Sequence, residues 1–153
     1  MAQANQLLPV RVQVDTLIYR EDEPPEEIAV KASGFRKPSV KGLFLVYYEE
    51  EEEIGRTQNV VKLDETDKPV LRIVRSGGLS MQQTYVVNET TEGQYEVPWG
   101  QWLTTVKTED IHFKNTQSQP TELLISYLLD IGGAGFAKYR VKITITEEEH
   151  EHD

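Results

Sequence analysis

Apolar and polar residues alternate along most of this chain, and no other feature restricts its fold as strongly. In residues 10–18, for example, Val10, Val12 and Val14 would share one face of a strand, with polar residues on the other face. Alternation with a period of two is typical of β-strands that bury one face. Similar segments recur about every 12 residues and are separated by turn residues, which is typical of a β-sandwich or β-barrel.

The alternation predicts about ten strands, and the candidate segments, eleven in all, are residues 10–18, 28–35, 40–48, 58–63, 70–75, 79–87, 94–97, 99–107, 111–114, 123–130 and 138–146. Residues 121–129 are the best helix candidate, but they lie between a proline and a glycine cluster and lack a charged face, so we expect a strand there. Hairpins between consecutive strands favour a meander, and closing it removes exposed edges.

We therefore expect one all-β domain over residues 1–153, a closed antiparallel meander barrel of about 8–10 strands. The strands would span residues 8–146, followed by a disordered acidic tail at 147–153. A two-sheet sandwich fits the same pattern.

The net charge of −10 comes from two acidic runs, residues 49–53 and the tail. These two runs contain ten acidic residues. The rest of the chain has sixteen acidic and sixteen basic residues, so it carries no net charge. Such runs stay solvated and repel phosphate backbones, which argues against nucleic-acid binding. The absence of an apolar membrane span, of a secretory signal and of cysteine leads us to expect a cytoplasmic chain without disulfides.

Four short motifs occur in an order that resembles the YwiB-like family of bacterial proteins, grouped as domain of unknown function 1934 (DUF1934). They are Val-Tyr-Tyr-Glu-Glu at 46–50, Val-Arg-Ser-Gly at 74–77, Glu-Val-Pro-Trp-Gly at 96–100, and the closing pair Ile-Ser-Tyr at 125–127 and Val-Lys-Ile at 141–143. The resemblance implies a calycin-type barrel, lipocalin-like in architecture, and no particular activity. Trp99 stands where we would expect a smaller residue, and an inward ring would partly fill a cavity.

No catalytic constellation is recognisable, so we expect no enzyme. Ser76 lies outside a nucleophile elbow, and His112 is the only histidine before the tail. Residues 132–135 are glycine-rich but lack the lysine and helix of a phosphate-binding loop. His150 and His152 alternate with acids and would bind metal weakly, and we expect no functional metal site and no cofactor.

Arginines and aromatic residues are the candidate ligand contacts. The strand at 70–75 places Arg72 and Arg75 on opposite faces, so one of them must point inward. An inward arginine needs a partner, such as Glu96, or an anionic ligand group, which the guanidinium fork suits. The candidate set is Tyr48, Arg72, Arg75, Tyr85, Tyr95, Trp99, Tyr127 and Arg140.

Two functions remain open. The first is a barrel that binds a small amphipathic or anionic ligand in an internal cavity. The second is a non-enzymatic interaction or structural module with a filled barrel, whose edge strand or aromatic patch binds a partner or a second copy of the chain. We expect neither a nucleic-acid nor a membrane partner.

Overall fold

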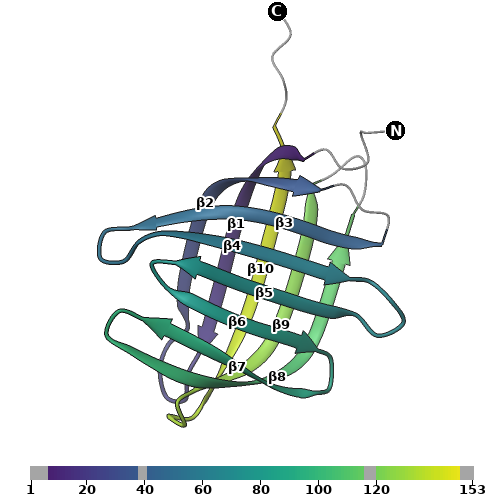
Figure 1. Ribbon diagram of the computed structural model, residues 1–153. Coiled ribbons are helices and arrows are strands. Elements are labelled where there is room, and N and C mark those ends of the chain that lie inside the picture. Colours follow the sequence, from purple (N-terminus) through teal and green to yellow (C-terminus); the bar gives the residue numbers. More distant parts are fainter. Residues whose placement is uncertain (1–6, 38–40, 116–119, 149–153) are drawn as a thin grey trace, which may run out of the picture.

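The barrel is formed by ten strands that follow one another around a closed sheet (Figure 1). The computed structural model describes residues 7–37, 41–115 and 120–148. In chain order the strands are β1 (Leu8–Tyr19), β2 (Glu26–Lys37), β3 (Gly42–Glu51), β4 (Gly55–Asp64), β5 (Val70–Gly77), β6 (Ser80–Val86), β7 (Thr90–Val97), β8 (Gly100–Lys114), β9 (Thr121–Ile131) and β10 (Phe136–Glu147). Each strand pairs antiparallel with the next, and β10 pairs with β1. The predicted closed meander is confirmed, and the two-sheet sandwich is not formed.

Most strand predictions hold, and the differences have local causes. The segments expected at 99–107 and 111–114 are one strand, β8, because a bulge between Thr108 and Asp110 shifts the register without ending the pairing with β9. Residues 121–129 lie in β9, as expected. The strand expected from Val40 begins at Gly42 in the described part of the chain, and β10 extends to Glu147. The predicted tail metal ligands His150 and His152 lie outside the described residues.

Alternation divides each strand between an inner and an outer face. Inward side chains from most strands form one apolar core, whose most deeply buried members include Val10, Leu43, Leu45, Val61, Leu71, Val106 and Leu123. A buried arginine, Arg36, ties β2 to β9 beside this core, donating from Nη1 to Oγ1 of Thr121 at 2.8 Å. No helix in the described residues is long and apolar enough to cross a membrane.

The ladder between β2 and β3 is short. Among the described residues, only Gly34 to Lys37 of β2 pair with β3, so residues 26–33 of β2 and residues 48–51 of β3 do not pair with each other. Gly34 permits this contact, because an added Cβ would overlap the carbonyl oxygen of Val46. In Figure 1, β2 follows β1 along its length and meets β3 only near its end. The barrel wall therefore has one stretch in which β2 and β3 are not hydrogen-bonded to each other, and we call this stretch the seam.

The ladder between β6 and β7 is also short, with three pairs, but side chains bridge it. Gln83 donates from Nε2 to Oγ1 of Thr91 at 3.3 Å, and its Oε1 accepts from Oγ1 of Thr104 at 2.6 Å. Because Gln83 and Thr104 are buried, these bonds join β6, β7 and β8 inside the barrel. In the described residues, side-chain hydrogen bonds thus bridge the short β6–β7 ladder but not the β2–β3 seam.

Candidate functional site

Four inward residues of β3, β4 and β5 form what we call the polar cluster: Tyr47, Glu49, Asn59 and Arg75. The antiparallel register places Tyr47, Asn59 and Arg75 in one row across the three strands. Glu49 lies one inward position further along β3, opposite Thr57. The cluster borders the seam, since Tyr47 is the last β3 residue paired with β2 and Glu49 lies beyond it.

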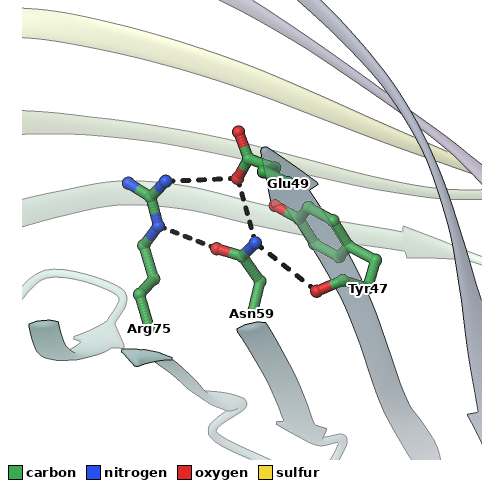
Figure 2. A network of polar contacts seen from close by, with 4 residues as sticks. All are labelled: Tyr47, Glu49, Asn59 and Arg75. Atoms are coloured by element: carbon green, nitrogen blue, oxygen red, sulfur yellow. Dashed lines mark hydrogen bonds and ion pairs between the residues drawn. The ribbon is translucent and has the colours of Figure 1, made fainter. Parts of the chain in front are cut away.

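The cluster is joined by one ion pair and a shared amide (Figure 2). Arg75 donates from Nη2 to Oε1 of Glu49 at 3.1 Å and from Nε to Oδ1 of Asn59 at 2.7 Å. Asn59 donates from Nδ2 to the same carboxylate oxygen at 2.9 Å and to the carbonyl oxygen of Tyr47 at 3.5 Å. The amide therefore holds both charged groups in a fixed relation.

This ion pair is only partly satisfied. The side chain of Arg75 is 23% exposed and that of Glu49 is 15% exposed, whereas Asn59 is 1% exposed. Among the described residues, Nη1 of Arg75 and Oε2 of Glu49 have no hydrogen-bond partner. Both groups can therefore bind water or a ligand without breaking the network.

Thr57 adds an unused polar group beside the cluster. It is 2% exposed, and its buried Oγ1 has no partner among the described residues. Thr57 pairs with Glu49 on one side and with Gly77 on the other. A buried hydroxyl without a partner is uncommon in folded proteins and points to a bound water or ligand group. Thr108, on β8, has a second such hydroxyl.

Tyrosines line the interior next to the cluster. The rings of Tyr85 and Tyr127 lie 4.9 Å apart at 59°, and those of Tyr127 and Tyr139 stack at 5.4 Å and 10°. Burial raises the pKa of Tyr85 to about 12 and raises the pKa values of Tyr47 and Tyr127 as well. The Arg75 guanidinium opposes each of these pKa shifts, as expected for a cation facing the rings. The hydroxyls stay neutral at physiological pH.

The structure brings only part of the predicted site together. Arg75 points inward with Leu71 and Ile73, and Tyr85 and Tyr127 are buried inside. The partner of Arg75 is Glu49, not the suggested Glu96, which is exposed on β7. Tyr95 is half-buried beside Trp102, with ring centroids 6.2 Å apart.

Four predicted contacts lie outside the interior, which corrects their assignment to it. Arg72 and Arg140 alternate with inward residues and are exposed on the outer face. Tyr48 also faces outward, with Arg56 4.4 Å above its ring. Trp99 lies in the turn between β7 and β8 and is 66% exposed, so it does not fill the barrel.

In the described part of the chain, three surface grooves can be outlined, and the polar cluster lines none of these three. A groove of about 610 Å³ crosses β10, β1 and β2 and includes Tyr48. A second, of about 590 Å³, crosses β8, β9, β10 and β1 and includes His112 and Arg140. A third, of about 180 Å³, includes Tyr95 and Trp102. The first groove lies on the outer side of the seam, because residues 31–33 of β2 and Tyr48 of β3 line it, whereas a ligand at the polar cluster would lie on the inner side of β3.

The sequence reasoning missed Glu49, Asn59 and Thr57. Glu49 was expected to be solvated within the acidic run, but β3 continues to Glu51, so Glu49 follows Leu43, Leu45 and Tyr47 on the inner face. Extending the alternation of β3 by one step would have identified it. Of the catalytic candidates, Ser76 is exposed at the end of β5, and His112 is exposed on β8, 3.0 Å from Asp110. In the described residues no group of three or more histidine or acidic side chains could hold a metal ion.

Comparison with known proteins finds a family model, a relative and a solved structure that are similar to this chain. The model of a family described as "Domain of unknown function (DUF1934)" matches residues 12–143. A relative described as "Uncharacterized beta-barrel protein YwiB", from Bacillus subtilis (strain 168), is 25% identical over 144 residues, which are 94% of this chain and 96% of the relative. The crystal structure of the ywiB protein from Bacillus subtilis superposes with a TM-score of 0.80 at 23% identity, covering 97% of this chain and 98% of that one.

Proposed function

This chain belongs to the DUF1934 family, and on that premise we propose that it is a non-enzymatic binding protein that holds a small amphipathic ligand at the polar cluster. One observation carries the proposal. The Arg75–Glu49 pair stands at the open seam with an unused donor group, Nη1, and an unused acceptor, Oε2. The unpartnered hydroxyl of Thr57 lies in the same row as Glu49.

The cost of the ion pair supports a functional role. Withdrawing two charges from water is expensive, and replacing such a pair with well-packed apolar residues is often neutral or stabilising. The neighbouring inward residues Leu45, Val61 and Ile73 form an apolar core, so the fold could have continued it. The buried, unpartnered hydroxyl of Thr57 beside this partly exposed pair supports a group that binds there.

The charges of the cluster favour a neutral amphipathic ligand over a simple anion. Glu49 lies 3.1 Å from Arg75 and neutralises its charge, so the Glu49 carboxylate would repel an anionic head group bound to Arg75. A ligand group that both accepts from Arg75 and donates to Glu49 would satisfy the two unused atoms. The tilted rings of Tyr85 and Tyr127 would offer the rest of such a ligand an aromatic surface.

Native mass spectrometry tests the proposal. The protein purified gently from the organism that encodes it is expected to carry a small mass that denaturation releases. Arg75→Gln should lose this mass, whereas Arg72→Gln should keep it, because Arg72 lies on the same strand but faces solvent. A bare wild-type mass, or equal retention by both variants, would contradict binding at the polar cluster.

The interaction module remains the second candidate because of exposed apolar side chains. Leu103 is 65% exposed, Trp99 66% and Phe136 46%, and inward side chains of most strands pack into one apolar core. Isolated exposed apolar residues are common, so only a contiguous interface would support this function. Replacing Leu103 and Phe136 with serine should then abolish partner binding and leave stability unchanged.

A further inference from the structure

The first half of β2 is an exposed strand edge. Residues 26–33 pair with β1 on one side, but only Gly34 and the residues after it pair with β3 on the other. Residues 26–29 are exposed, including Ile28 at 41%. The backbone N–H and C=O groups on this side are available to another strand.

We propose that this edge pairs antiparallel with the same edge of a second copy, with Ala29 on the two-fold axis. A two-fold axis perpendicular to the sheet keeps the inner faces of both copies on the same side. Because side chains alternate along a strand, facing residues must then be an even number of positions apart, so the axis passes through a residue and not between two residues. Pro25 ends the available ladder on one side because proline lacks a backbone donor, and the β3 junction at Gly34 ends it on the other. Ala29 is the centre of residues 26–32 between these two limits.

This register matches both faces of the strand. On the outer face, Glu27 of each copy lies opposite Lys31 of the other copy, which gives two charge pairs. The two Ala29 residues face each other between these pairs. On the inner face, Ile28 lies opposite Val30 of the second copy, again twice. Opposite charges and β-branched pairs at facing positions are the combinations that stabilise antiparallel strands.

The neighbouring two-fold registers match less well. An axis through Val30 would place Lys31 opposite Ala29 and Glu27 opposite Ser33, leaving the charges without partners. An axis through Ile28 would place Glu26 opposite Val30 and bring Lys31 against Pro25. Charged residues along a free strand edge usually prevent edge-to-edge pairing. Here Glu27 and Lys31 face each other only when the axis passes through Ala29, so these charges favour that register over its neighbours.

A ladder of this length is a small interface, so we expect a reversible dimer that forms in the micromolar to millimolar range. Sedimentation velocity over that range should show a concentration-dependent dimer. Lys31→Glu should raise the dissociation constant about tenfold or more, because two attractive pairs become two repulsive ones. The swap Glu27→Lys/Lys31→Glu should restore the wild-type value.

A cysteine placed on the axis tests the register directly, because the chain has no cysteine of its own. Facing Cα atoms in antiparallel strands lie about 4.5–5.5 Å apart, within the range that a disulfide spans. Ala29→Cys should form a disulfide-linked dimer under mild oxidation, and Lys62→Cys, exposed on the fully paired strand β4, should not.

Equal cross-linking of the two cysteine variants would overturn the proposed register. A wild-type chain that stays monomeric at every concentration would overturn the dimer and leave the edge to an extended peptide of another protein. Because the readouts are mass and cross-linking, their outcome is independent of ligand binding at the polar cluster.

Discussion

Removing the cation from the polar cluster should destabilise the fold by an amount that its burial sets. In Arg75→Met, the Glu49 side chain, which is 15% exposed in the wild type, would lose its ion pair, and Oδ1 of Asn59 would lose its donor. Breaking a fully buried pair typically costs about 3–5 kcal/mol. Because both side chains retain solvent contact, we expect a loss of about 2–3 kcal/mol in the free energy of unfolding.

A double-mutant cycle measured by urea unfolding isolates the interaction. Glu49→Gln should cost about 1–2 kcal/mol, and the double variant should be more stable than the sum of the single losses by about 1–2 kcal/mol. Arg72→Met is the matched control, since Arg72 is exposed on the same strand, and it should stay within about 0.5 kcal/mol of the wild type. An additive cycle, or equal losses for Arg75→Met and Arg72→Met, would refute the coupling.

Three further results are expected. Burial raises the pKa of Tyr85 to about 12 and also raises that of Tyr127, so the tyrosines of the unfolded chain ionise first. The free energy of unfolding of the wild type should therefore be complete below about pH 10 and fall above it. Urea unfolding at stepped pH should show a shallower fall in this free energy for Tyr85→Phe. Gly34→Ala should cost at least about 3 kcal/mol, because the new Cβ overlaps the β3 backbone at the short seam; a near-neutral thermal denaturation midpoint would contradict this geometry. Leu45→Ala, in the 0% exposed core, should cost about 2–5 kcal/mol, whereas Trp99→Phe in the exposed turn should stay within about 0.5 kcal/mol, as measured by calorimetry.

Local pattern was enough to determine the architecture. The alternation of Val10, Val12 and Val14 recurs in the other strands, and consecutive strands joined by short turns pair as a meander. Its failures were also local. The bulge at Thr108 split β8 into two apparent strands, because one added residue inverts the apolar pattern of everything after it.

The candidate site was less accessible from the sequence. Alternation correctly required one inward arginine on β5, but it could not choose between Arg72 and Arg75, since both alternate with apolar residues. It also treated Glu49 as one member of a solvated run, because a run of glutamates carries no periodicity of its own. The bond from Arg75 to Glu49 joins residues that are 26 positions apart in the chain.

What the sequence determined by itself is the strand period, the turn positions and the absence of cysteine, because these depend on neighbours along the chain. Only the tertiary structure decided which face became the interior, that β2 separates from β3 after four pairs, and that the polar cluster gathers at this seam. The reason is physical. Register and closure are set by the packing of all ten strands at once, and a side chain gains its partners only when strands distant in sequence are brought together.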